Sequence, residues 1–542
     1  MSEVLIIQLS RLGDAIQSNH LLVEWKAARP ETQIDLISLT ETATVLSGLP
    51  LRNLFLIPSK QWKALETALS EKRFDEAREI GSGILQTFPL ARYRLIVNID
   101  FAYASCWLSS HIEGEARMGG RLDAAGGRLY DDWGSLFRAI ALYQNASHLN
   151  LVDLFRSLAR TGYVPHEQSR PPLAAAGSLP FPLPEGRRVA LNPGANEAWR
   201  RWPAEKFAAL AQRLHAGGWT PVLVGSGNDS ELCRSIAAMC PFPLADFSGR
   251  TSVNQMVTLL RQMELLISND TGAVHLAAAA GTRVLGLYER IPYLFTTAPW
   301  SQGNLVLYCP DAEQALTPEL VHLAALERLG QASPEQLAQA LDQAGVEGWE
   351  TLFLPAGADP LSGLTYLPMH RRGEPAQRLF VYVIRHLLAQ HLCGGGAVSL
   401  QPLQEWIAAG RLPLDCAAAA QFDAMQQLVQ GYSYALDELA QQAAQACDAA
   451  DRGDRGEMTR LAGLLSAGMH ALPPTSAECP PLQFLMAFLS QKLQQVQFLP
   501  LAELLRCYQT ELQWTARLLR EGLRLTARLL PEQSMRAAGQ NS

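Results

Sequence analysis

The sequence has little charge of either sign and no long apolar run. Only 18% of the 542 residues are charged, and 45 Lys and Arg against 52 Asp and Glu leave a formal net charge of −7. A chain with this balance lacks the overall positive field of a dedicated nucleic-acid-binding protein, so we expect no nucleic-acid partner. No uninterrupted apolar stretch reaches about 18 residues, and the sequence therefore predicts no membrane-spanning helix.

Paired cysteines and a targeting signal are also missing. The nine cysteines are scattered, none forms a CxxC pair, and no histidine stands at zinc-finger spacing beside them. We therefore expect reduced structural thiols, as in cytoplasmic proteins, and no metal held by them. The first residues, Met1-Ser2-Glu3, carry no basic segment of the kind that opens a signal peptide, which favours a cytoplasmic location.

The first 330 residues alternate short apolar runs with helical patterns. Runs that are almost continuously apolar predict the central strands of parallel sheets: 4–8, 34–37, 54–57 and 95–99, then 189–192, 222–224, 265–267 and 284–287. A proline-rich stretch at 166–187 interrupts the alternation and predicts a linker. The pattern therefore indicates an α/β protein with two Rossmann-like domains, at 1–165 and 188–333, that face a cleft.

The composition changes after residue 333. Strand patterns become scarce, and Ala, Leu and Gln recur at helical spacing. We predict that residues 334–542 form an appended all-helical domain whose leucines are mainly its own core. The sequence does not indicate what this domain does, and oligomerisation, recognition of a substrate and docking to a membrane surface all remain open.

A short polar motif follows the first predicted strand. It reads Ser10-Arg11-Leu12-Gly13-Asp14 and lies where the carboxyl end of a strand meets the start of a helix. Gly13 would let the backbone approach a ligand closely. Asp14 could cap the helix or act as a general base, and spacing alone favours the cap.

Two motifs of the second half suit an anionic ligand. Gly194 lies in a loop after a predicted strand, and Arg200 follows at the start of a helix, where guanidinium and backbone N–H groups bind phosphate oxygens. The segment 268–275 reads SNDTGAVH and opens a helix of small residues. Its side chains and N–H groups could converge on a phosphate; the residues concerned are Asp270, Thr271, Gly272 and His275.

A third loop, Gly225-Ser226-Gly227-Asn228-Asp229-Ser230-Glu231, also follows a predicted strand. It lacks the third glycine of the dinucleotide fingerprint, so it does not indicate an NAD site. Asp229 or Glu231 could bind a ribose, and helix capping by Asn228 or Asp229 is an equally good interpretation.

In their order and spacing these motifs resemble glycosyltransferase family 9, which contains the bacterial lipopolysaccharide heptosyltransferases. The likeness covers residues 1 to about 330 and is carried by SRLGD at 10–14, NPGA…WRRWP within 192–203 and SNDTGAVHLAAAAGTRVLGLY at 268–288. The resemblance implies a GT-B fold, a nucleotide-sugar donor held by the second domain and an acceptor approached from the first. It also implies inverting transfer without a metal ion or other cofactor, and ADP-L-glycero-D-manno-heptose as the usual donor.

The resemblance also implies roles for individual residues. Asp14 matches the catalytic base, and Arg200 stands where the family usually has a Lys that contacts the donor phosphates. Glu231 is a looser match to a ribose-binding carboxylate. The remaining matches are Asp270, Thr271, Gly272 and His275 on the diphosphate side, with Gly13 and Gly194 as positions of close backbone approach. After Tyr288 the chain departs from the family's frequent Gly-Pro turn, in the loop near the sugar.

The resemblance thus predicts a glycosyltransferase of lipopolysaccharide biosynthesis that moves heptose from ADP-heptose to a glycolipid or other glycan. We expect it in the cytoplasm, with or without peripheral contact at the inner face of the cytoplasmic membrane. Two alternatives stay open. One is a GT-B transferase that uses another nucleotide sugar or a protein acceptor. The other is a non-catalytic GT-B scaffold whose helical tail binds a partner. The sequence does not indicate the oligomeric state.

Overall fold

The structure is a computed structural model, and it describes most of the chain. The described residues are 3–88, 90, 92–123, 126–142, 148–159, 178–289, 294–309, 316–353, 364–369, 375–392, 401, 404, 416–472, 479–495 and 501–529. They fall into two compact units: an α/β unit of residues 1–129, 150–356 and 361–372, and a helical unit of residues 130–149, 357–360 and 373–542. Most of the predicted linker at 166–187 lies outside the described residues.

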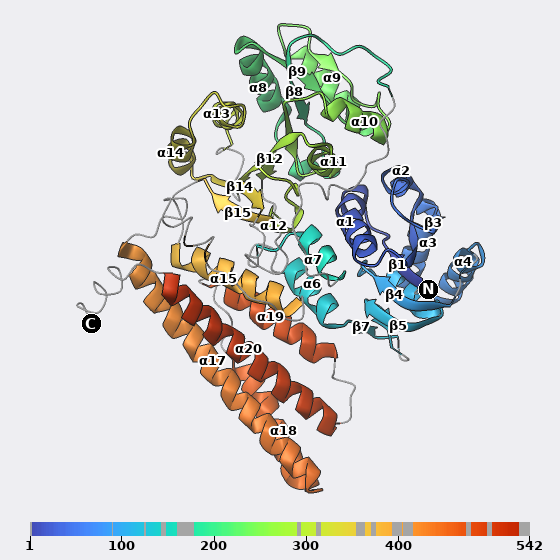
Figure 1. The fold of residues 1–542 in the computed structure, drawn as a ribbon, viewed down its shortest axis with the longest axis vertical. Helices are drawn as coiled ribbons and strands as arrows, with labels where there is room; N and C mark the ends of the chain where they lie inside the picture. The colour runs from blue at the N-terminus through green and yellow to red at the C-terminus, as the bar shows by residue number, and fades with distance from the viewer. Residues whose placement is uncertain are drawn as a thin grey trace. The chain divides into compact units, whose positions relative to one another are not determined.

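The first domain of the α/β unit is a five-stranded parallel sheet in the order β3-β2-β1-β4-β5 (Figure 1). Its strands are β1 (Glu3–Ile7), β2 (Gln33–Leu39), β3 (Asn53–Ile57), β4 (Tyr93–Asn98) and β5 (Gly114–Gly119). Its helices are α1 (Leu12–Ala28), α2 (Ala43–Leu46), α3 (Ser59–Ser70), α4 (Phe74–Gln86) and α5 (Tyr103–His111); η1 (Thr40–Thr42) and the short pair β6 (Arg121–Leu122) and β7 (Arg128–Leu129) complete it. The four apolar runs predicted as strands are confirmed, and their side chains form its core.

The second domain repeats this plan in an eight-stranded sheet, in the order β10-β9-β8-β11-β12-β13-β14-β15. The parallel strands are β8 (Arg187–Asn192), β9 (Trp219–Leu223), β10 (Ala245–Asp246), β11 (Leu265–Asn269), β12 (Arg283–Glu289) and β13 (Leu305–Cys309). The helices are α8 (Ala204–Ala216), α9 (Ser230–Ala238), α10 (Val253–Leu260), α11 (Gly272–Ala280), α12 (Leu294–Thr297), α13 (Pro318–Arg328) and α14 (Pro334–Ala344), with η2 (Ala198–Arg200) and η3 (Gly227–Asp229). In both sheets the strand order reverses beside the first strand, which is the position where doubly wound sheets bind ligands.

The predicted boundary between residues 333 and 334 is wrong. Ser333 caps α14, whose Leu337 and Leu341 are buried in the core of the second domain. The strand β14 (Glu347–Phe353) then extends the sheet by antiparallel pairing with β13, and β15 (Leu364–Pro368) pairs antiparallel with β14. Both strands mix polar and apolar residues, so they lack the continuous apolar run that is typical of a buried parallel strand.

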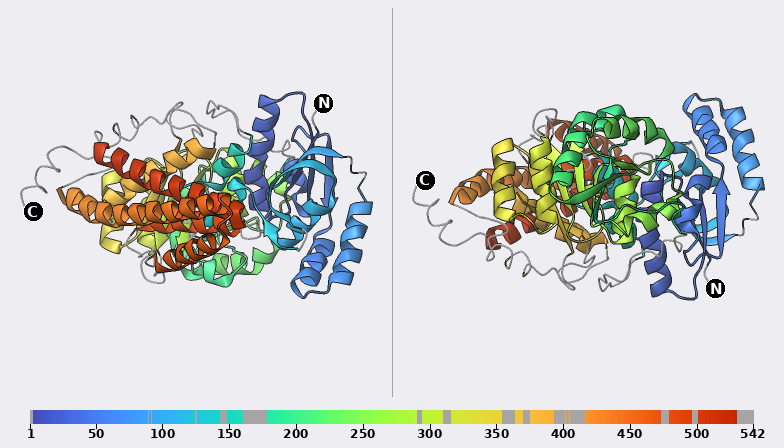
Figure 2. Two further views of the ribbon diagram at one scale, coloured as in Figure 1. Left: turned by 90° about the horizontal axis from the view of Figure 1, so that it is seen from below. Right: turned by 90° about the horizontal axis from the view of Figure 1, so that it is seen from above.

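The helical unit contains α6 (Asp132–Leu142), α15 (Pro375–Leu392), α17 (Cys416–Asp451), α18 (Arg455–Ala471), α19 (Pro480–Gln495) and α20 (Leu501–Leu529). The longest two, α17 and α20, run side by side (Figures 1 and 2) and pack along much of their length. Residues 130–142 were predicted to belong to the first domain, which is also wrong, because the apolar face of α6 packs on α19. In the described part of the chain, no helix combines the length and the apolar composition that spanning a bilayer requires.

The predicted fold class is confirmed. Two Rossmann-like sheets form one α/β unit, and a helical region follows them. One further helix, α7 (Leu151–Ser157), packs against α1, and its Asp153 and Arg156 form a buried ionic cluster with Glu24 of α1. The first-domain helix that begins at the SRLGD motif is thereby held in place within the unit.

Candidate functional site

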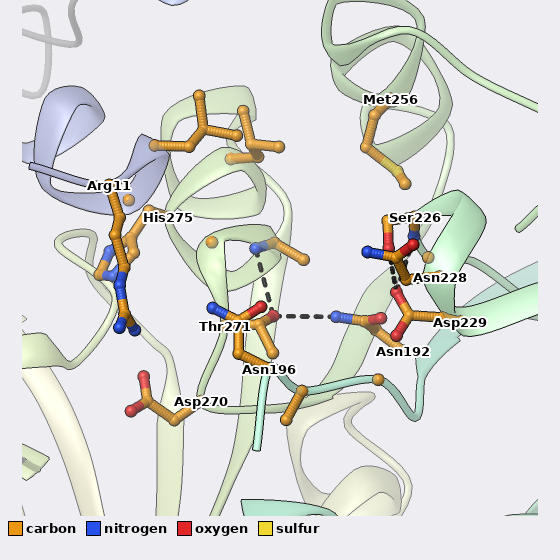
Figure 3. A pocket seen from close by; sticks show the side chains of 18 of the residues that line it. Arg11, Asn192, Asn196, Ser226, Asn228, Asp229, Met256, Asp270, Thr271 and His275 are labelled. Atoms are coloured by element: carbon orange, nitrogen blue, oxygen red, sulfur yellow. Dashed lines mark hydrogen bonds between the residues drawn. The ribbon is translucent and has the colours of Figure 1, made fainter. Parts of the chain in front are cut away.

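A cavity of about 770 Å³ opens at the carboxyl ends of the strands of both domains (Figure 3). Its wall is built from the loop after β1 and the start of α1, the loops after β8, β9 and β11, and the starts of α10 and α11. The lining residues with polar side chains include Arg11, Asp14, Asn192, Asn196, Arg200, Arg201, Ser226, Asn228, Asp229, Thr251, Ser252, Asp270, Thr271 and His275. The cavity thus lies at the switch points of the two sheets.

Eight of the nine residues singled out from the sequence line this cavity: Gly13, Asp14, Gly194, Arg200, Asp270, Thr271, Gly272 and His275. The structure does not bring Glu231 to it. Glu231 lies in the first turn of α9 and is exposed. Asp229 does line the cavity, but its carboxylate accepts hydrogen bonds from Ser226 N and Ser226 Oγ, so it serves as a helix cap as well.

Asp14 is not the N-cap that the spacing favoured. Helix α1 begins at Leu12, its N-cap is Arg11, and Asp14 lies inside the first turn. The glycine before it is required by a close approach: a Cβ on Gly13 would lie 2.9 Å from Cδ2 of His275. The N-termini of α1 and α11 therefore meet at the cavity, with the positive ends of both helix dipoles close together.

Burial, together with the nearby carboxylates of Asp100 and Asp270, raises the pKa of Asp14 to about 6, and Arg11 opposes this rise. Asp100, just after β4, was not found from the sequence. It accepts hydrogen bonds from Ala102 N at 2.8 Å and Ser105 Oγ at 3.2 Å. Its position at the end of the strand next to β1 is the signal that could have found it.

Hydrogen bonds from side-chain amides join the loops after β8 and β11. Asn192 Nδ2 donates to Thr271 Oγ1 at 2.9 Å, and Asn269 Nδ2 donates to Pro193 O at 2.8 Å. Thr271 is the N-cap of α11 and accepts a hydrogen bond from Ala273 N. These bonds hold the first turn of α11 in place, and Gly272 in this turn faces the cavity. Helix starts of this kind bind phosphate.

Arg200 is already engaged in the structure. Its Nη2 donates to the carboxylate of Asp270 and to Asp270 O, the latter at 3.1 Å, and both side chains are largely buried. Burial raises the pKa of Asp270, and the ion pair with Arg200 opposes that rise. The residue expected to face the donor phosphates thus neutralises a carboxylate of the protein.

His275 lies one turn into α11 and is buried against Gly13. Burial lowers the pKa of its imidazole to about 4. At neutral pH the ring is therefore uncharged, and it can donate a single N–H to an anion without adding positive charge.

The described residues include no group of three or more His, Cys, Asp or Glu side chains placed to hold a metal ion. Transfer without a metal ion stays a prediction.

Part of the chain matches a known protein family. Residues 153–319 match glycosyltransferase family 9 (heptosyltransferase). The lipopolysaccharide core heptosyltransferase OpsX of Haemophilus influenzae is 24% identical over 319 residues, which cover 56% of this chain and 83% of that protein. Lipopolysaccharide heptosyltransferase 2 of Salmonella typhimurium is 27% identical over 303 residues, covering 53% of this chain and 82% of that protein.

Solved structures are similar over about three-fifths of the chain. The family 9 glycosyltransferase of Veillonella parvula has 16% identity and a TM-score of 0.45, covering 61% of this chain and 98% of that one. The ADP-heptose lipopolysaccharide heptosyltransferase II of E. coli has 20% identity and a TM-score of 0.42, covering 61% and 98%. The family match over residues 153–319, together with the heptosyltransferase relatives, identifies the chain as a glycosyltransferase.

Proposed function

We propose that the protein transfers heptose from ADP-heptose to a lipopolysaccharide-type acceptor, with inversion at the anomeric carbon and without a metal ion. The observation that carries this proposal is that Asp14, from the first domain, and the start of α11, from the second, line one cavity. The sugar and acceptor follow the names of the relatives that match most of their length, which are lipopolysaccharide heptosyltransferases. ADP is the nucleotide that the motif resemblance implies.

In the proposed reaction, Asp14 takes the proton of the acceptor hydroxyl as that oxygen bonds to the anomeric carbon of the donor. The bond between this carbon and the diphosphate oxygen breaks, and its electron pair leaves with ADP. A carboxylate with a pKa of about 6 is mostly ionised at neutral pH and is a stronger base than an ordinary Asp, which suits this task.

The leaving diphosphate gains negative charge, and the start of α11 supports it. The N–H groups of the first turn, near Thr271 and Gly272, and the neutral ring of His275 offer hydrogen bonds. Because these groups are fixed before the reaction, they need no reorganisation when the charge develops.

Two measurements on the full chain test the proposal. Calorimetry with ADP, GDP and UDP identifies the nucleotide, and mass spectrometry with a lipopolysaccharide acceptor that lacks heptose detects transfer. We expect ADP to bind most tightly, and transfer from ADP-heptose to persist in EDTA with inversion seen by NMR. Tighter binding of GDP or UDP would overturn the donor assignment. Failure of all three to bind would favour the scaffold alternative.

We further propose that the enzyme acts from the cytoplasm on an acceptor at the inner face of the cytoplasmic membrane. The lipopolysaccharide acceptors in the names of the relatives support this proposal. Fractionation of cells that make the tagged full chain should place it in the cytosol or in a salt-extractable membrane fraction. Recovery from the periplasm would contradict it.

A further inference from the structure

The cavity wall holds three guanidinium groups, and two of them bind oxygen atoms of the protein. Arg200 pairs with the carboxylate of Asp270. Arg201 donates from Nε and Nη2 to Ala195 O, at 2.9 and 2.7 Å. Both groups are thus engaged with the protein, Arg200 through Nη2 and Arg201 through Nε and Nη2, although Nε of Arg200 has no partner among the described residues.

The third guanidinium belongs to Arg11. It lines the cavity, it is exposed, and its side chain makes no hydrogen bond or ion pair with another described residue. Arg11 is also the N-cap of α1, a position at which Ser, Thr, Asp or Asn normally satisfies the free N–H groups. A cation there adds to the positive end of the helix dipole, so the position favours an anion from outside the protein.

The anion site nearest to Arg11 is the start of α11. A Cβ on Gly13 would lie 2.9 Å from His275 Cδ2 and 3.7 Å from Gly272 Cα, so the first turns of the two helices are in contact. Figure 3 shows the Arg11 side chain extending beside His275 toward Asp270. His275 is buried and adds no positive charge at neutral pH. The cation beside this helix start that has no partner in the described part of the chain is thus Arg11, from the first domain.

We propose that Arg11 is a donor-binding residue that contacts the diphosphate held at the start of α11. Arg11 provides the positive charge for the diphosphate, because the charge of Arg200 is neutralised by Asp270. Residues of both domains therefore form the donor site. This inference rests on the proposed function, which it deepens. The planar guanidinium can bind two phosphate oxygens at once, so it also fixes the orientation of the leaving group.

Calorimetry on the full chain tests the proposal, with ADP, AMP and adenosine as probes, or the matching series of another base if that nucleotide binds better. We expect Arg11→Gln to weaken ADP binding by about 10- to 100-fold and adenosine binding not at all. Arg11→Lys should fall between the wild type and Arg11→Gln. The matched control is Arg78→Gln, an exposed arginine of α4 that pairs with Asp75, and it should leave all three affinities unchanged.

Four outcomes would overturn the assignment of Arg11. The first is an unchanged ADP affinity in Arg11→Gln with a raised KM for the acceptor, which would place the arginine on the acceptor side. The second is an equal loss of ADP and adenosine binding, which would indicate a general disturbance of the cavity. The third is a larger loss of ADP binding in Arg201→Gln than in Arg11→Gln. The fourth is a wild type that binds no nucleoside diphosphate, and that result alone would refute the proposed function as well.

Discussion

Replacing Asp14 by Asn should abolish transfer and at the same time stabilise the α/β unit at alkaline pH. Burial and the nearby carboxylates raise the pKa of Asp14 from 3.8 to about 6. A difference of roughly two pKa units, at 1.36 kcal/mol each, corresponds to about 3 kcal/mol of unfavourable free energy for the ionised carboxylate in the folded state. Asn keeps the shape and removes the charge, so this cost disappears.

The sign and the pH window follow from the direction of the pKa shift. Below the unfolded pKa the carboxyl is protonated in both states and contributes almost nothing. Between about pH 4 and pH 6 the unfolded chain loses the proton first, so the free energy of unfolding falls as the pH rises. Above about pH 6 the full cost persists. Asp14→Asn should therefore stabilise the unit by up to about 3 kcal/mol at pH 8 and by less than about 1 kcal/mol at pH 4.

Hydrogen exchange is the appropriate assay because the chain has two units and need not unfold in one step. Peptides within 3–28, which hold β1 and α1, report the opening of the α/β unit alone. Exchange is compared between the wild type and Asp14→Asn at pH 8 and pH 4, and turnover is measured in parallel. A variant that is destabilised at pH 8, or equally stabilised at both pH values, would refute the electrostatic reasoning.

Three further predictions concern the surroundings of Asp14. Because the charge of Asp100 raises the pKa of Asp14, Asp100→Asn should shift the acid limb of the kcat/KM profile to lower pH, and an unmoved limb would contradict this coupling. Gly13→Ala would place a Cβ 2.9 Å from His275 and should destabilise the unit by about 1–3 kcal/mol, a loss that His275→Ala should partly restore in thermal melts. Glu231→Gln should leave the Kd for ADP unchanged in calorimetry, since Glu231 is exposed and does not line the cavity; a weaker Kd would return it to the donor site.

The part of the fold that could be predicted is the part in which one local pattern determines one structure. The strands β1, β8 and β11 are nearly continuous apolar runs, and motifs that directly follow such strands must gather at the ends of parallel sheets. Asp14 and Asp270 could therefore be assigned to one site although 256 positions separate them in the sequence. Their placement needed only the strand order and no side-chain detail.

The features that were missed depend on long-range partners. The strands β14 and β15 are defined by pairing, β14 with β13 and β15 with β14, and α6 belongs to the helical unit through its contacts with α19. The pairing of Arg200 with Asp270 likewise joins distant loops, so the sequence could propose a charge at Arg200 but not its neutralisation. Arg11 lies within the SRLGD motif, but the motif alone does not indicate that its guanidinium has no partner among the described residues.

The central claim is that Asp14 acts as the base on a donor whose diphosphate lies at the start of α11. The most direct test measures both ADP affinity and transfer from ADP-heptose in the same preparations of wild type and Asp14→Asn. We expect both proteins to bind ADP with similar Kd. The rate of sugar transfer should be several orders of magnitude lower in the variant than in the wild type. Transfer by Asp14→Asn at a rate near that of the wild type would contradict it.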